Sequence, residues 1–170
     1  MLSAPIGSLD PKKSLAAGWQ SEGMAALAWA LDCIELPPFY QQCDPAETAA
    51  MMGFLRDIDE TPLLKPFLRA ADQIGALADS YLTVHWRLRE QTLRPCHMDF
   101  VGYVARCNWG PLHLDGLEIV DGDLAVKGTP VNQLDENQFQ EALSITRERH
   151  HALNWLVGTE ELYSDVTTDT

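Results

Sequence analysis

The sequence predicts a mostly α-helical protein, a helical bundle with a small β-hairpin inserted before its last long helix. Two observations favour this fold. Over several long segments, apolar residues recur at steps of three and four positions, as they do along the buried face of a helix. From about Leu112 to Val131 that period is absent, and short alternating runs surround two Asp-Gly pairs. A length of 170 residues fits a single domain over residues 1–170.

The N-terminal part is expected to become helical only at Ser21, which is a good N-cap residue. Residues 1–18 contain two prolines and two glycines, and they are expected to form a loosely structured lead-in. The first helix should end where Pro37 and Pro38 interrupt it, because proline lacks the amide hydrogen and restricts the residue before it.

The letters CDPAE predict the start of a second helix, with Asp44 as its cap and Pro45 at its first position. This helix is expected to run to about Ile58. Thr61 then predicts the cap of a further short segment. One long helix should follow over residues 67–93, because a continuous apolar stripe runs along it.

The next segment is expected to begin with a short helix over residues 100–107, capped by Asp99. Asp121 and Gly122 lie between the runs LEIV and DLAV. They predict the turn of the β-hairpin, since both central positions of such a turn need a positive φ.

The last long helix is expected to start after Asp135, with Gln138 completing a capping box three positions later. Gly158 is a natural stop for it. Residues 159–170 follow as a C-terminal tail that carries four acids and no base.

The charge of the chain restricts its partners. There are 25 acidic and 12 basic residues, which gives a formal net charge of −13. Such a surface repels nucleic acids and anionic membranes, so neither is expected as a partner. No apolar stretch reaches the roughly 18 residues of a membrane span.

Four cysteines without a C-x-x-C pair, and a start that lacks a signal-peptide pattern, favour a cytoplasmic protein. No phosphate loop or dinucleotide fingerprint is present, and no cofactor is expected. The sequence does not indicate an oligomeric state.

Three stretches together resemble a bacterial family known only as domain of unknown function 4272. They are SEGMAALAWALDCIELPP from Ser21, ADSYLTVHWRLRE from Ala78, and RERHHALNWLVG from Arg147 with the closing YSDVTTDT. The resemblance implies a mostly helical, soluble bacterial domain and supplies no reaction. The chain departs from the family pattern over residues 94–135, which stand where the family has a short loop and which bring in the hairpin.

A Glu/His cluster is the candidate catalytic or metal site. Glu148 and His151 form an E-x-x-H step, which places both on one side of a helix. Glu22 and His85 lie on other helices of the expected bundle and could complete the site, with His85, Glu148 and His151 as the metal ligands. His150, on the same helix as Glu148, is a further catalytic candidate. The alternative is that these residues form a buried polar network, since His85 and His150 lie on apolar stripes. That alternative is the favoured one.

Two tryptophans are candidate anchors for a partner, because Trp19 and Trp109 are expected to flank helix ends. Arg89, Arg149 and Asp165 are further candidate binding residues at positions within the resemblance. The favoured function is a non-enzymatic protein-interaction module, because the chain lacks catalytic motifs, and its acidity would suit a basic partner. The alternative is a metal-dependent hydrolase-type enzyme with the Glu/His site inside the bundle.

Overall fold

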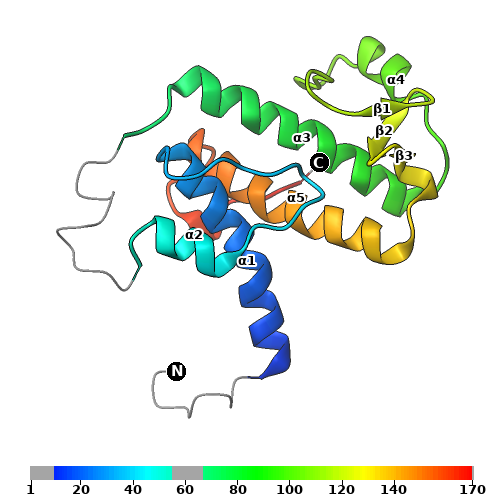
Figure 1. Cartoon of the computed structure of the whole chain (residues 1–170). Coiled ribbons are helices and arrows are strands. Elements are labelled where there is room, and N and C mark those ends of the chain that lie inside the picture. The colour runs from blue at the N-terminus through cyan, green and yellow to red at the C-terminus, as the bar shows by residue number, and fades with distance from the viewer. Residues whose placement is uncertain (1–9, 55–66, 170) are drawn as a thin grey trace.

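A computed structural model describes residues 10–54 and 67–169, and its long helices form a bundle that carries a small sheet at one end (Figure 1). The elements in chain order are α1 (Pro11–Ala30), α2 (Pro45–Met51), α3 (Ala71–Leu93), α4 (Phe100–Arg106), β1 (Ile119–Val120), β2 (Asp123–Val126), β3 (Thr129–Pro130), the 3-10 turn η3 (Val131–Gln133), α5 (Glu136–Leu156) and the 3-10 turn η4 (Tyr163–Asp165). The predicted fold class is confirmed.

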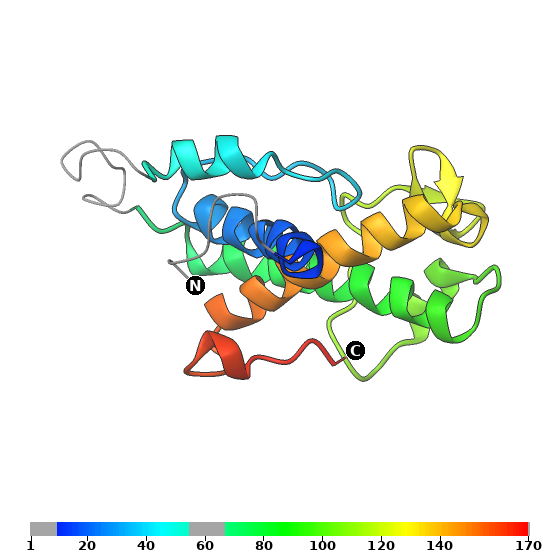
Figure 2. The ribbon, with the colours of Figure 1, turned by 90° about the horizontal axis from the view of Figure 1, so that it is seen from below.

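The core lies where α5 packs against both α1 and α3. Figure 2 shows α2 and its preceding loop on one side of α1, and the C-terminal tail on the opposite side of the bundle. α1 packs closely on α5 because most residues of its buried face are small. A side chain at Gly23 would bring its Cβ within 2.7 Å of the Tyr163 hydroxyl and 3.3 Å of the Glu148 carbonyl oxygen. No helix in the described ranges is both long and apolar enough to cross a membrane.

The start of α1 corrects the prediction for the N-terminus. The helix begins at Pro11, with the Asp10 carboxylate accepting a hydrogen bond from the Lys12 amide at 2.9 Å. Ser21 is not a cap, because its hydroxyl donates to the Gly18 carbonyl inside the helix. The loosely structured lead-in expected over residues 1–18 is therefore wrong from residue 11 onward, and residues 1–9 lie outside the described part. The first half of α1 projects beyond the bundle (Figure 1).

α2 has the predicted cap and is shorter than predicted. Asp44 accepts from the Ala46 and Glu47 amides, but the helix ends at Met51 and Gly53 takes a φ of 75°. The expected end near Ile58 and the Thr61 cap fall outside the described residues.

α3 begins at Ala71 rather than at residue 67, because the segment before it is held by α1. The Arg69 amide donates to the Ala30 carbonyl at 2.9 Å, and the Arg69 Nε donates to the Trp29 carbonyl at 2.8 Å. A helix over residues 67–70 would have to break these contacts.

The predicted short helix, hairpin and final helix are present. Asp99 caps α4, and Asp121 (φ 53°) and Gly122 (φ 79°) form the turn between β1 and β2. A second turn of the same kind at Lys127 and Gly128 adds β3, so the sheet has the antiparallel order β1-β2-β3. The predicted capping box of Asp135 and Gln138 starts α5.

A buried ion pair attaches this sheet to α3. The Arg87 Nε and Nη2 atoms donate to the two carboxylate oxygens of Asp123, each at 2.6 Å, and both side chains are fully buried. Asp123 also accepts from the amides of Met98 and Leu124. The attachment of the inserted segment to the bundle therefore depends on the Asp123 carboxylate of β2, which Arg87 of α3 neutralises.

Replacing Asp123 by alanine should lower the free energy of unfolding by about 3–5 kcal/mol, because it leaves the Arg87 guanidinium buried without a counter-charge. Urea unfolding followed by circular dichroism measures the change. Asp115→Ala removes an exposed acid from the same segment and should cost no more than about 0.5 kcal/mol. Equal costs for the two variants would contradict the structural role of the pair.

Candidate functional site

A buried ion pair between Arg149 of α5 and Glu22 of α1 lies at the centre of the molecule. The Arg149 Nε and Nη2 atoms donate to Glu22 Oε2 at 2.9 and 2.7 Å, and both side chains are fully buried. The other oxygen, Oε1, accepts from the Cys43 amide at 2.8 Å. The carboxylate of Glu22 is thus fully occupied by structural bonds.

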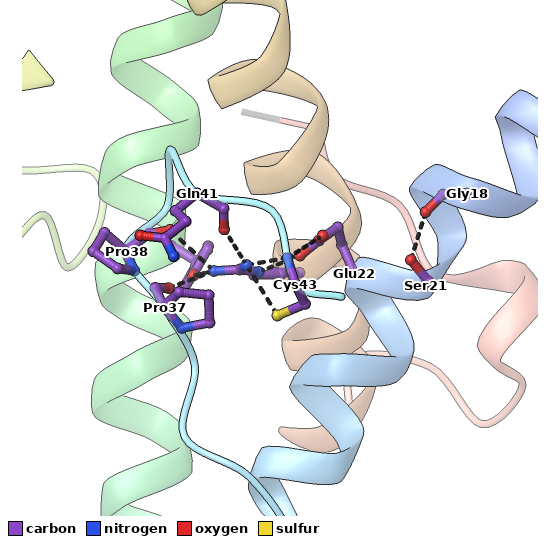
Figure 3. Close-up of polar contacts among 9 residues, drawn as sticks. Gly18, Ser21, Glu22, Pro37, Pro38, Gln41 and Cys43 are labelled. Atoms are coloured by element: carbon purple, nitrogen blue, oxygen red, sulfur yellow. Dashed lines mark hydrogen bonds and ion pairs between the residues drawn. The ribbon is translucent and has the colours of Figure 1, made fainter. Parts of the chain in front are cut away.

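The same guanidinium holds the loop between α1 and α2, whose residues Pro37, Pro38, Gln41 and Cys43 are labelled in Figure 3. Arg149 Nη1 donates to the Pro37 carbonyl at 2.7 Å, and Nη2 donates to the Gln41 carbonyl at 2.9 Å. The Cys43 sulfur lies 3.4 Å from Nη2. Because this loop has no helix or strand partners at these carbonyls, Arg149 replaces the bonds that regular structure would supply.

Tyr81 brings α3 into the same network. Its hydroxyl accepts from Arg149 Nη1 at 2.8 Å. Burial raises the pKa of the Tyr81 phenol, so the hydroxyl stays protonated at neutral pH. One guanidinium therefore joins α1, α3, α5 and the loop over residues 37–43.

A second buried contact joins α3 to α5 through two histidines. The Nδ1 atoms of His85 and His150 lie 2.9 Å apart, and each residue is 2% exposed. One Nδ1 must donate and the other accept, so the accepting ring is neutral and at most one ring can carry a charge in this arrangement. Burial lowers the pKa of His85 to about 3, helped by His150, Arg89 and Arg147. Burial likewise lowers the pKa of His150 to about 4.

Each histidine of the pair lines a separate cavity on the seam between α3 and α5. His85 lines a cavity of about 310 Å³, and His150 lines one of about 320 Å³. The C-terminal tail contributes Thr168 to the first and Asp169 to the second. Asn154 holds the tail by donating to the Thr167 carbonyl at 3.1 Å.

The structure does not gather the predicted catalytic and metal-binding residues into one site. Glu148 pairs with Arg147, and His151 Nε2 lies 2.9 Å from the Tyr163 carbonyl oxygen. Within the described ranges, no three His, Cys, Asp or Glu side chains are grouped so that they could hold a metal ion. His85 and His150 are brought together, while Glu22 belongs to the Arg149 network.

The candidate anchors lie in different surroundings. Trp19 does not flank a helix end as expected, because it lies within α1, where it is half-buried. Trp109 follows α4, is 50% exposed and donates its indole N–H to the Tyr103 hydroxyl at 3.0 Å. Asp165 is exposed in η4, where it accepts from Ser164.

An open acidic cavity lies beside the loop that Arg149 holds. Its volume is about 540 Å³, and Pro37, Gln41 and Cys43 form part of its wall. Its lining also includes four acids, which are Asp32, Glu35, Asp44 and Glu47. No sequence pattern predicts this cavity, because its acids come from three different segments: the end of α1, the loop and α2.

Three important partners were also missed, namely Tyr81, Arg87 and Asp123. Tyr81 lies on the predicted apolar stripe of α3, so a polar group at a buried position was the available signal for it. Arg87 is also buried in α3 but lies off that stripe, so the pattern gave no signal for it. Asp123 lies directly after the predicted hairpin turn, where an acid is easily taken as turn chemistry.

A family model described as "Domain of unknown function (DUF4272)" matches residues 6–100 of the chain. The match includes Glu22, Tyr81 and His85, but it ends before α5, which carries Arg149 and His150. The C-terminal stretch from Arg147 that contributed to the resemblance lies beyond the matched residues. Neither the curated proteins nor the solved structures contain a detectable match to this chain.

Replacing Glu22 by glutamine should lower the free energy of unfolding by about 3 kcal/mol or more, because it leaves Arg149 charged and buried without an anion. Thermal and urea unfolding measure the effect. Glu141→Gln removes an exposed acid from α5 and serves as the matched control. A Glu22 variant as stable as this control would rule out the ion pair as a main determinant of stability.

Acid should destabilise the protein through the histidine pair. The folded-state pKa values, about 3 and about 4, lie below the unfolded value of 6.5, so the unfolded chain takes up protons first. The contribution of the neutral pair to the free energy of unfolding is therefore fully present above pH 6.5. It falls as the pH is lowered towards 4, by up to about 1.4 kcal/mol per pH unit for each ring.

The double variant His85→Leu, His150→Leu lacks both groups, so its melting temperature should fall less over this pH range. Carboxylates titrate equally in both proteins and cancel in the comparison. Parallel pH profiles for the two proteins would be evidence against a neutral buried pair.

Proposed function

The chain belongs to the DUF4272 family, whose description assigns no activity, and we propose on its geometry that it is a non-enzymatic interaction domain for a basic segment of another protein. The observation that carries this proposal is the acidic cavity of about 540 Å³ between the end of α1 and α2. A cavity of this size accommodates one or two side chains of a partner.

The carboxylates of this cavity differ in how free they are. Asp32 and Glu35 both lie 2.7 Å from Arg69 Nη2, so one cation serves two acids. Asp44 is occupied in capping α2. The Glu47 side chain makes no hydrogen bond or ion pair with another described residue, which makes it the most available carboxylate for a lysine or arginine of a partner.

The charge of the whole chain supports the same partner chemistry. A net charge of −13 speeds the encounter with a basic protein and opposes the approach of nucleic acid. All four cysteines lie within the described ranges and are free thiols, which suits a reducing compartment. We therefore propose the cytoplasm as the site of this interaction.

The alternative of a metal-dependent hydrolase receives no support from the arrangement of its candidate residues. Glu22 is fully bonded to Arg149 and the Cys43 amide. His85 and His150 face each other, and His151 faces the Tyr163 carbonyl. None of these contacts orients a carboxylate and an imidazole towards a common substrate position.

Binding of a fluorescent arginine-rich peptide, followed by anisotropy at low ionic strength, tests the acidic cavity. Glu47→Lys places a positive charge in the cavity and should weaken binding by about tenfold or more, because like charges then meet at short range. Glu141→Lys makes the same change of net charge on exposed α5 and should weaken binding much less. Equal losses would show that net charge acts without the cavity, and would overturn the proposed site.

The same pair of variants then identifies the natural partner. A basic protein retained from a native lysate by the wild type and by Glu141→Lys, but not by Glu47→Lys, would use the cavity. Retention of that protein by all three would place its binding site elsewhere on the surface.

A further inference from the structure

The cavity lined by His85 differs in charge from the rest of this acidic chain. It lies between the C-terminal half of α3, the middle of α5 and the tail, and its volume is about 310 Å³. Its polar lining residues are His85, Arg89, Thr92, Arg147 and Thr168, and no carboxylate of a residue that the structure describes lines it. It shares no lining residue with the acidic cavity.

Arg89 is the central group of this cavity. It is half-buried, and its guanidinium forms no ion pair or hydrogen bond with any other residue that the structure describes. By contrast, the guanidinium groups of Arg69, Arg87 and Arg149 are each matched by a carboxylate. A partly desolvated guanidinium without an anion is unfavourable, so a bound anion would complete its environment.

Two further donors face the same space. Arg147 uses Nε and Nη2 for Glu148, which leaves its Nη1 group available at the cavity. The Thr168 hydroxyl makes no hydrogen bond with another described residue, while Thr92 already donates to the Leu88 carbonyl at 3.2 Å. Arg147 and Thr168 therefore approach the cavity from α5 and from the tail, opposite Arg89 on α3.

His85 supplies a donor whose direction the histidine pair controls. Its Nδ1 faces His150, so its Nε2 is the ring nitrogen that remains for a ligand. When His150 donates its Nδ1 proton to His85, the proton of His85 lies on Nε2. A ligand that accepts from this N–H therefore favours one of the two tautomeric arrangements of the pair.

We propose that this cavity binds a small oxyanion of the phosphate type, held by Arg89 and Arg147 with Thr168 and His85 as hydrogen-bond donors. Donors that converge from α3, α5 and the tail suit a tetrahedral group with several acceptor oxygens. The volume is near the lower limit of small-molecule sites, which fits one phosphoryl group with little attached to it. The site does not depend on the proposed interaction function.

Isothermal titration calorimetry with inorganic phosphate, at constant ionic strength in sodium chloride, tests the site. The wild type should bind phosphate saturably. Arg89→Gln should weaken binding by about tenfold or more, because it removes charge-assisted hydrogen bonds. Its melting temperature without phosphate should not fall, since Arg89 has no bond to another described residue. Arg89→Lys keeps the charge without the planar fork and should lie between the two.

Arg94→Gln is the matched control. Arg94 is 78% exposed at the end of α3, pairs with Glu90 and does not line the cavity. Its replacement changes the net charge equally and should alter phosphate binding by no more than about twofold. Equal weakening in the Arg89 and Arg94 variants would overturn the proposal. So would a wild-type protein that binds neither inorganic phosphate nor glycerol phosphate saturably.

A second titration with glycerol phosphate distinguishes the source of the anion. Tighter binding of glycerol phosphate than of inorganic phosphate assigns the site to a small phosphomonoester. Tighter binding of inorganic phosphate assigns it to the free anion. Both assignments require that Arg89→Gln lose the binding.

Discussion

The contact between Arg149 and Glu22 is the interaction on which the rest of the fold depends, because it gives the chain a charged centre instead of a purely apolar one. A buried charge is tolerated only when its hydrogen bonds are complete, and here they are completed by groups from α1, α3, α5 and the loop over residues 37–43. The bundle can therefore close in one register, since a shift of any helix would leave part of this network unpaired.

This constraint also shapes the surface. Pro37, Gln41 and Cys43 contact Arg149 on one side and form the wall of the acidic cavity on the other. On the opposite part of the molecule, the neutral histidine pair separates two smaller cavities and contributes no charge to either. The acidic cavity beside α2 and the cavity lined by His85 between α3 and α5 therefore differ in charge, since carboxylates line the first and arginines line the second.

Local signals predicted the parts of the fold that local physics decides. The capping box at Asp135, the cap at Asp99 and the Asp121-Gly122 turn depend on residues within a few positions of each other. The prolines and glycines of residues 1–18 wrongly predict a loosely structured lead-in, although Asp10 and Pro11 form a cap of the same kind as Asp44 and Pro45.

The site was harder to predict than the fold. Placing His85 on a buried stripe was correct, but its partner is 65 positions away, and Arg149 lies 127 positions from Glu22. The E-x-x-H spacing of Glu148 and His151 describes one helix only. It carries no information about which side chains of other helices approach it, and here each of the two residues has its own separate partner.

Two buried ion pairs link the region that the family model matches to the rest of the chain. The family-model match ends at residue 100, yet Glu22 and Arg87, which lie inside the matched region, are neutralised by Arg149 and Asp123, which lie outside it. A fragment that ends at residue 100 would expose the apolar faces of α1 and α3, and it would leave Glu22 and Arg87 without their counter-charges. The unit held together by these ion pairs therefore extends beyond the matched region, because it includes β2 and α5.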